Sequence, residues 1–295
     1  MPLDLYLHTP MPNDMNERRA ISRMARLLHR RYLYSDAHLL LVANINPDFS
    51  PPLRERQLPQ LDGLLLGPEF IALLEFKNYF DPIIAPSLEG SWYAQGSKRR
   101  QPVVGGSKKN PYLQAKNSRS AWLPYFQELT MSLLSPARRT NLRTAWYHLS
   151  VFLLFHPMLH PESKLPPLGR EGYWLNIRGL DDVVELAYAV RSPQLQLTLD
   201  ERKILVERGL GARPWQKISS LLYDTVGHVY VKEPGEAPVA YPVQPFDDFT
   251  LGRASAQGHR IMLDNEKISR VHARVEVETA GIRLYDLDST NGTFV

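Results

Sequence analysis

The chain has 295 residues, of which 43% are hydrophobic and 22% charged, and its formal net charge is +4. This composition is typical of a globular protein, and the length predicts about two domains of roughly 100–200 residues each. The absence of cysteine excludes disulfide bonds, thiolate zinc sites and a cysteine nucleophile. The N-terminal sequence lacks the basic and then apolar order of a signal peptide, and no apolar run reaches the roughly 18 residues of a membrane span. We therefore predict a cytoplasmic protein without membrane contact.

Helical and extended patterns alternate over the first three quarters of the chain. Apolar residues three and four positions apart predict a helix over residues 14–31, with Glu17 on its apolar face. Asn110 followed by Pro111 is typical of a helix start, which places Gln114 in the first turn of a helix running to about Leu134. The other expected elements are strands at 37–45 and 144–155, a hairpin at 61–79, and helices at 181–190 and 200–223. This alternation predicts a mixed α/β domain.

The pattern changes near residue 225. From there, short alternating runs are separated by turn residues, as in "GHVYVKE", "FTLGR", "HARVEVE" and "IRLYDL". Such runs are typical of an antiparallel β-sandwich. We therefore predict two domains, an α/β domain at residues 1–222 and an all-β domain at residues 223–295.

The expected hairpin carries three charged residues among apolar ones. Glu75 and Lys77 are two positions apart in a strand and therefore share a face. A two-residue turn at Gly67-Pro68 would bring Asp62 onto that face as a diagonal neighbour of Glu75. Two carboxylates at this spacing can share a divalent cation, and a lysine beside them can hold a water or a phosphate oxygen. The alternative is an ordinary ion pair between Glu75 and Lys77 at a partly exposed strand edge.

The order of these residues resembles the PD-(D/E)XK nuclease superfamily, in which an aspartate ends one strand and E-x-K lies on the next. More narrowly, it resembles the nuclease-related NERD domain. The resemblance covers about residues 1–220 and includes Glu17, "QLDGLLL", "ALLEFKNY" and the later "NPYLQ". The sequence departs from the family at "NERR", where members usually have a small residue before the glutamate.

This resemblance implies a restriction-endonuclease-like core, a mixed sheet flanked by helices. It also implies Mg²⁺, or Mn²⁺, held by Asp62, Glu75 and the carbonyl of Phe76. Lys77 would orient the attacking water or neutralise phosphate charge. Gln114 and Glu17 would complete the catalytic site through hydrogen bonds or the outer shell of the metal.

A basic stretch without any acid lies between the E-x-K strand and the Gln114 helix, at residues 98–119. Its charged residues are Lys98, Arg99, Arg100, Lys108, Lys109, Lys116 and Arg119. A patch of this kind can follow a phosphate backbone, so we expect it to contact DNA or RNA. The alternative is a solvated, flexible loop.

Three motifs near the C-terminus occur in a fixed order. They are Gly252-Arg253, Ser269-Arg270-Val271-His272 and Thr290-Asn291-Gly292. Together they resemble the forkhead-associated (FHA) domain, which recognises phosphothreonine peptides. The sequence printed here ends at Val295, directly after the T-N-G turn, so we expect the FHA sandwich to be incomplete, with open sheet edges.

The FHA resemblance assigns roles to five residues, Arg253, Ser269, Arg270, Thr290 and Asn291. Arg253 is a charge-assisted donor to the phosphate, and Ser269 supplies a hydroxyl. Arg270 adds positive potential, while Thr290 and Asn291 belong to the turn that holds the peptide backbone.

The combined prediction is a Mg²⁺-dependent nuclease-like protein that hydrolyses DNA or RNA and also binds a phosphothreonine-containing protein. A Ser/Thr kinase is then implied as a functional partner. The first alternative is a non-catalytic adaptor that binds nucleic acid or protein in kinase signalling. The second is a protein whose sole function lies in the FHA module.

Overall fold

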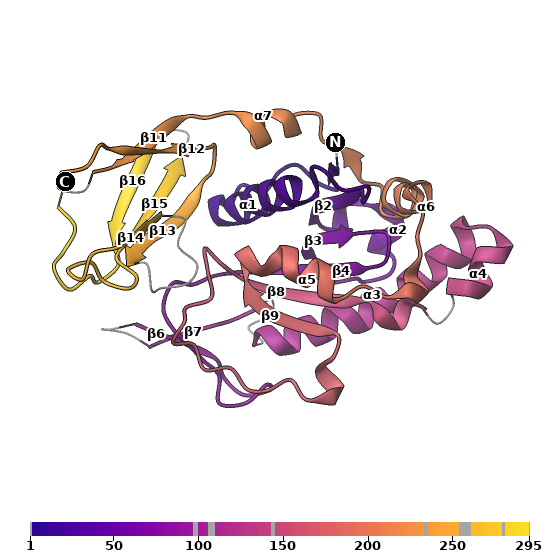
Figure 1. The fold of residues 1–295 in the computed structure, drawn as a ribbon. Helices are drawn as coiled ribbons and strands as arrows, with labels where there is room; N and C mark the ends of the chain where they lie inside the picture. Colours follow the sequence, from indigo (N-terminus) through magenta and orange to yellow (C-terminus); the bar gives the residue numbers. More distant parts are fainter. Residues whose placement is uncertain are drawn as a thin grey trace.

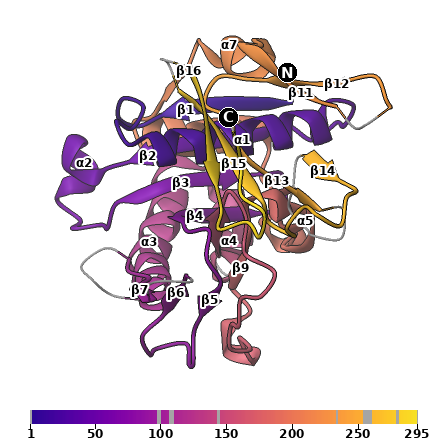
Figure 2. The ribbon, with the colours of Figure 1, turned by 90° about the vertical axis from the view of Figure 1, so that its left-hand side faces the viewer.

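The structure is a computed structural model that describes residues 2–96, 100–105, 110–142, 145–232, 235–253, 261–278 and 281–294. The chain forms an α/β region (residues 2–223) and a β region (residues 227–294), which lie side by side (Figure 1). Figure 2 shows the β region in front of the α/β region, with its strands next to helix α1. The prediction of an α/β part followed by a β-rich part is confirmed.

The α/β region is built on a mixed seven-stranded sheet in the order β10-β1-β2-β3-β4-β8-β9. The strands are β1 (Leu3–Leu7), β2 (Leu39–Ile45), β3 (Leu61–Leu66), β4 (Ile71–Asn78), β8 (Ser150–His156), β9 (Leu175–Gly179) and β10 (Arg213–Pro214). β4 pairs in parallel with β8 and antiparallel with β3. β4 is therefore a central strand, and its apolar residues are buried on both faces of the sheet.

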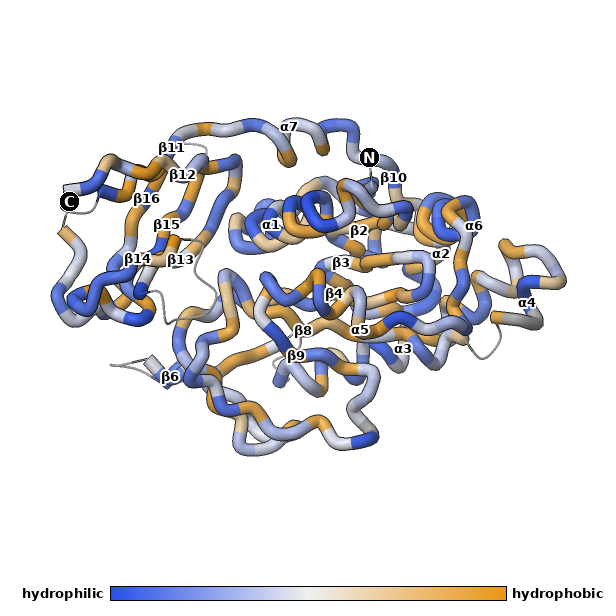
Figure 3. Tube along the Cα trace, viewed as in Figure 1, coloured by the Kyte–Doolittle hydropathy of each residue, from blue (hydrophilic) through white to orange (hydrophobic). Residues whose placement is uncertain are grey.

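Helices cover both faces of this sheet. One face packs against α1 (Met15–Tyr32), α5 (Val183–Ala189) and α7 (Ile218–Tyr223), and the other against α3 (Pro111–Leu133). The shorter helices are α2 (Pro51–Arg54), α4 (Pro136–Leu142) and α6 (Leu199–Ile204), and a π turn at Leu205–Gly209 follows α6. The 3₁₀ turns are Pro47–Phe49, Ala145–His148, Arg170–Gly172, Leu180–Asp182 and Pro193–Leu195. A small sheet, β5 (Ile83–Ile84), β6 (Tyr93–Gln95) and β7 (Arg100–Pro102), lies beyond the end of β4. Hydrophobic residues concentrate on the central strands in Figure 3.

Three expected elements differ from the structure. The single helix expected at 200–223 is wrong: α6 and the π turn end at Gly209, a short strand follows, and α7 begins only at Ile218. Gly211 has φ +75° and Pro214 cannot donate to a helix, so the helix cannot continue. The strand expected at 144–155 begins at Ser150, and the helix expected at 181–190 is a 3₁₀ turn followed by α5.

The β region contains a four-stranded sheet in the order β14-β13-β15-β16 and a hairpin of β11 and β12. The strands are β11 (Gly227–Val231), β12 (Val239–Val243), β13 (Asp248–Arg253), β14 (Ile261–Leu263), β15 (Ala273–Glu278) and β16 (Gly281–Asp286). β13 and β14 pair in parallel, so the expectation of a purely antiparallel arrangement is wrong at this pair. The apolar core between these strands is small and includes Phe249, Val275 and Val277.

Buried ion pairs join the two regions. Arg26 of α1 pairs with Asp247 at 2.6 Å, and both side chains are at most 5% exposed. Arg19 of α1 pairs with Glu276 of β15 at 3.0 Å. Arg23 donates to the carbonyl of Asp248 at 2.7 Å. Since these charges lie away from water, the pairing fixes β13 and β15 against α1.

Within the described residues, no helix combines the length and apolar character needed to cross a membrane.

Candidate functional site

The β3–β4 hairpin has a different turn from the predicted one. The N–H of Gly67 donates to the carbonyl of Phe70 at 2.9 Å, so these two residues face each other and Pro68-Glu69 form the loop. The predicted loop at Gly67-Pro68 is therefore wrong by one residue. A Cβ on Gly67 would lie 2.2 Å from the Phe70 ring, which shows how tightly this turn closes. Gly63 pairs with Leu74, and the same register places Asp62 directly opposite Glu75 instead of diagonal to it. The register differs by two residues, so Asp62 keeps the predicted face.

Glu75 is the buried centre of an acidic site formed by Glu17, Asp62, Glu75, Lys77 and Gln114. Its side chain is 1% exposed. Its Oε2 accepts a hydrogen bond from Gln114 Nε2 at 2.6 Å and lies 3.8 Å from Lys77 Nζ. Its Oε1 accepts from the hydroxyl of Ser118 at 3.3 Å. Both carboxylate oxygens therefore have donors, and each keeps a lone pair for a further partner.

Asp62 is held from the backbone of β4. The N–H of Phe76 donates to Asp62 Oδ2 at 2.6 Å. Every second residue from Phe70 onward directs its backbone N–H and carbonyl toward β3. Phe76, six positions later, therefore also directs its N–H and its carbonyl toward β3. The carbonyl of Phe76 thus lies on the same side of β4 as the carboxylate of Asp62.

Gln114 connects the lysine to the glutamate. Lys77 Nζ donates to Gln114 Oε1 at 3.0 Å, while the amide nitrogen of Gln114 donates to Glu75. Asn110 caps α3 by accepting from the N–H of Leu113 at 2.7 Å, and this cap places Gln114 in the first turn of the helix. A Cβ on Gly105 would lie 2.9 Å from Gln114 Cβ, so the bare backbone of Gly105 makes room for this amide.

Three acids of this site share one lysine. Burial raises the pKa of Glu75 to about 8, with a further contribution from the charge of Asp62. Burial also raises the pKa of Asp62, against the opposing effect of Lys77. Glu17, in the first turn of α1, has a pKa raised to about 7 by burial and then by Asp62. With all three carboxyl groups ionised, the site would therefore hold more negative charge than Lys77 compensates.

This charge excess fits a divalent cation at Asp62 and Glu75. Among the described residues, no group of three or more His, Asp or Glu side chains is arranged to hold a metal. Mg²⁺, however, keeps several waters and is often bound through only one or two carboxylates. Two carboxylates and the Phe76 carbonyl form a hard oxygen set of that kind.

Ser118 and Gly105 complete the acidic site and were absent from the sequence-based predictions. Ser118 lies four residues after Gln114 and hence on the same face of α3, so the helical spacing alone could have suggested it. Gly105 gave no comparable sequence signal, because its role depends on the packing of a loop against α3.

The predicted basic patch is only partly within the described residues. Lys98, Arg99, Lys108 and Lys109 lie outside them. Arg100 stacks on the ring of Tyr93, 3.8 Å from its centroid, and Lys116 pairs with Glu89 at 3.1 Å. Arg119 donates to the carbonyls of Leu149 and Tyr147 at 2.9 and 2.7 Å, so its guanidinium holds the start of β8.

A second group of predicted residues meets at one end of the β region. The hydroxyl of Ser269 accepts from the N–H of Thr290 at 2.9 Å, and the two hydroxyls are 3.3 Å apart. The N–H of Ser269 donates to His272 Nδ1 at 3.2 Å, so His272 supports this loop. Asn291 Nδ2 donates to the carbonyl of Lys267 at 2.6 Å and ties the two loops together.

The two predicted arginines differ in their partners. The N–H of Arg253 donates to the carbonyl of Ser269 at 3.1 Å, which places Arg253 beside the serine. Its buried Nε has no hydrogen-bond partner among the described residues. Arg270 instead forms an ion pair with Glu162 of the α/β region.

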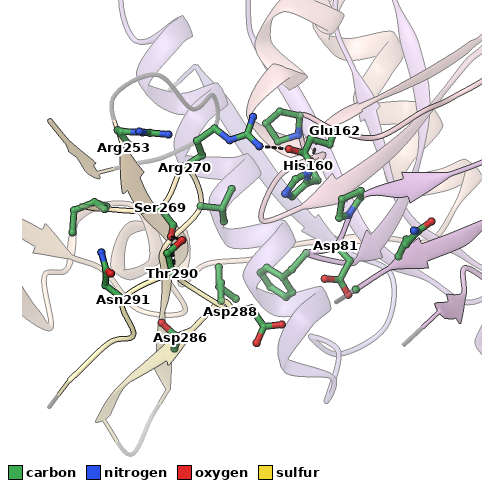
Figure 4. A pocket seen from close by; sticks show the side chains of 18 of the residues that line it. Asp81, His160, Glu162, Arg253, Ser269, Arg270, Asp286, Asp288, Thr290 and Asn291 are labelled. Atoms are coloured by element: carbon green, nitrogen blue, oxygen red, sulfur yellow. Dashed lines mark hydrogen bonds and ion pairs between the residues drawn. The ribbon is translucent and has the colours of Figure 1, made fainter. Parts of the chain in front are cut away.

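A pocket of about 1100 Å³ opens between these loops and the α/β region. Arg253, Ser269, Arg270, Thr290 and Asn291 all line it. Figure 4 shows Asp81, His160 and Glu162 of the α/β region on the facing wall. The residues of the three C-terminal motifs thus surround one pocket.

The comparison with protein families assigns this end of the chain. The FHA domain model matches residues 249–295. No curated protein and no solved structure matches the chain. The comparisons give no support to the nuclease resemblance of residues 1–222. The FHA domain supports binding of phosphothreonine peptides, because FHA domains recognise phosphorylated motifs through arginines.

Proposed function

We propose that the chain binds a phosphothreonine-containing protein at the pocket formed by Arg253, Ser269, Thr290 and Asn291. The observation that carries this proposal is the buried Nε of Arg253, which lacks a hydrogen-bond partner among the described residues. A phosphothreonine brings about −1.5 to −2 charges and three acceptor oxygens, which match the donors of an arginine and a serine hydroxyl. A Ser/Thr kinase that phosphorylates the bound protein is then a functional partner.

Capture of peptides from a phosphothreonine library by the full chain tests this proposal. We expect binding to phosphorylated but not to phosphatase-treated peptides, and an affinity at least about tenfold lower for Arg253→Ala, since hydrogen bonds to a charged group contribute roughly 1.5–3 kcal/mol. Arg31→Ala is the control, because Arg31 is exposed in the last turn of α1. Equal affinity of Arg253→Ala and the wild type would contradict the proposal.

A second candidate function is hydrolysis of a phosphodiester at the acidic site. The observation that favours it is the pair of hydrogen bonds at Gln114, which accepts from Lys77 and donates to Glu75 and so joins the E-x-K strand to the later Gln. A buried ion pair alone does not require Asp62 and Glu17 beside it. The two acids are costly there without a compensating charge, and a site for a cation and a phosphate explains that cost.

Each residue of the acidic site would have its own role in phosphodiester hydrolysis. Asp62, Glu75 and the Phe76 carbonyl would hold Mg²⁺ or Mn²⁺. When bound, this ion supplies a water of lowered pKa and positive charge for the scissile phosphate. Lys77, fixed by Gln114, orients the attacking water or neutralises a phosphate oxygen. Gln114 is a positioning residue, because it acts through Lys77 and Glu75. Arg100 and Lys116, together with the basic residues outside the described ranges, would contact DNA or RNA.

Cleavage of a mixed DNA and RNA panel in the presence of Mg²⁺ tests this candidate. We expect Glu75→Gln and Lys77→Met to lower the rate by about 10²–10⁴, the range found for positioned proton-transfer and charge-stabilising groups. Glu185→Gln and Lys217→Met are the controls, since both residues are exposed on the surface of the α/β region. If the wild type binds nucleic acid or a partner protein and cuts nothing, the adaptor function replaces hydrolysis.

A further inference from the structure

The pocket beside the FHA motifs is formed by both regions of the chain. The β region supplies Ser269 and Thr290, and the α/β region supplies Phe80, Asp81 and His160. Asp81 follows β4 by three residues, and His160 follows β8 by four. A peptide held at Ser269 and Thr290 therefore meets side chains that lie outside the FHA domain (Figure 4).

The facing wall is fixed relative to the FHA domain. The guanidinium of Arg274 on β15 stacks on the ring of Phe80, 3.7 Å from its centroid. Arg274 is in turn held by Asp248 through hydrogen bonds of 2.7 and 2.5 Å, and the Asp248 side chain is 2% exposed. Because Phe80 directly precedes Asp81, this stacking holds Asp81 at a set position across the pocket.

Acidic side chains on both walls of the pocket indicate the charge of the ligand that fits between them. Asp81 comes from the α/β wall and Asp288 from the FHA wall. Partial burial raises the pKa of Asp81, His160 opposes this shift, and the charge of Asp288 adds to it. Asp81 and Asp288 both line the pocket (Figure 4), so a positive group bound between them would stabilise the charged form of each carboxylate.

We propose that the bound peptide runs between the two walls and that Asp81, with Asp288, recognises a lysine or arginine near the phosphothreonine. This inference rests on the proposed phosphothreonine binding and extends it to the sequence of the partner. The α/β region then acts as a specificity-determining wall of the FHA site. The preferred ligand is a phosphothreonine peptide with a basic residue on one side of the phosphate.

An oriented peptide library, with a fixed phosphothreonine and degenerate flanking positions, tests the inference on the full chain. The wild type is expected to enrich lysine or arginine at one flanking position. For the enriched peptide, Asp81→Asn lowers the affinity roughly three- to tenfold, the effect of losing an ion pair worth about 1 kcal/mol. Asp288→Asn, on the opposite wall, lowers the same preference. Asp36→Asn, an exposed site in the α/β region, leaves it unchanged.

The outcomes separate this inference from the proposed function. Binding of phosphothreonine peptides without a basic preference overturns the inference and leaves phosphothreonine binding intact. A preference for basic residues that persists in both Asp81→Asn and Asp288→Asn also overturns the inference and leaves phosphothreonine binding intact. Failure of the wild type to bind any phosphothreonine peptide overturns both. Thermal unfolding of each variant shows that a lost preference does not come from a lost fold.

Discussion

The ionisation of Glu75 determines how much negative charge the acidic site holds. Its side chain is 1% exposed and lies among two other carboxyl groups, and its pKa is raised to about 8. Ser118 and Gln114 both donate to it, and Lys77 is 3.8 Å away. These donors lessen the cost of burying its charge, but Lys77 must also offset the charge of the neighbouring Asp62.

The raised pKa of Glu75 makes stability depend on pH. Between the ordinary value of 4.5 and the folded value of about 8, the folded state holds a proton that the unfolded state has lost. The free energy of unfolding therefore falls as pH rises through this window. Glu75→Gln removes the effect, so we expect its Tm relative to the wild type to be higher at pH 8 than at pH 5, by about 3 °C or more. Scanning calorimetry at the two pH values measures this difference.

Two comparisons make this experiment decisive. Glu185→Gln, at an exposed position of α5, should show the same Tm difference from the wild type at both pH values. The same difference for Glu75→Gln at pH 5 and pH 8 would contradict the pKa shift. If Asp62 and Glu75 also hold a divalent cation, Mn²⁺ raises the Tm of the wild type at pH 8 and has less effect on Glu75→Gln.

At the scale of elements, the helix starts follow from local sequence. Asp14 caps α1 by accepting from the N–H of Asn16 at 2.7 Å, and Asn110 caps α3 in the same way. These contacts span two or three residues, so a single sequence is enough to predict them. The break after α6 also had a local signal, the glycines and proline of "RGLGARP", but it was outweighed by the apolar spacing on either side.

Contacts between distant elements could not be predicted in this way. The register of β3 on β4 depends on where the turn closes, and the pairing of Gly67 with Phe70 places the two-residue loop one position later than the predicted one. The pairing of α1 with β13 and β15 joins residues more than 200 positions apart, as in the bond between Arg26 and Asp247. Arginines on an amphipathic helix indicate an exposed face, and only the folded chain shows that they are buried.

Replacement of Asp247 tests how strongly helix α1 and the β region depend on each other for stability. Its removal leaves Arg26, which is 5% exposed, without the carboxylate that lies 2.6 Å away. We expect Asp247→Ala to lower the free energy of unfolding by about 3–5 kcal/mol, the cost of leaving one partner of a buried ion pair uncompensated. Urea unfolding measures the change, and Asp36→Ala is the exposed control. A loss equal to that of the control would mean that water reaches Arg26 and that the interface does not depend on this pair.

At the scale of the whole molecule, the β region that contains the FHA domain meets the α/β region at two separate places. One contact is the buried network of α1, and the other is the pocket at the far end of β4 and β8. Residues 80 and 81 link the pocket to Glu75 and Lys77 along a single strand and its extension. The pocket and the acidic site therefore share β4 as a common support.

Glu162 provides the last test, because it forms an ion pair with Arg270, which the FHA resemblance places near the phosphate. Arg270 and Glu162 are 61% and 51% exposed, so their ion pair contributes at most about 1 kcal/mol. If Arg270 contacts the phosphate, the phosphate competes with this carboxylate, and we expect Glu162→Gln to raise the affinity for a phosphothreonine peptide roughly two- to fivefold at low salt. The gain should shrink above about 0.5 M salt, where exposed charges are screened. Glu128→Gln is the matched control, since Glu128 and Arg56 form a pair elsewhere whose side chains are 50% and 49% exposed. Fluorescence anisotropy measures the affinities, and weaker binding by Glu162→Gln would show instead that Glu162 contacts the peptide directly.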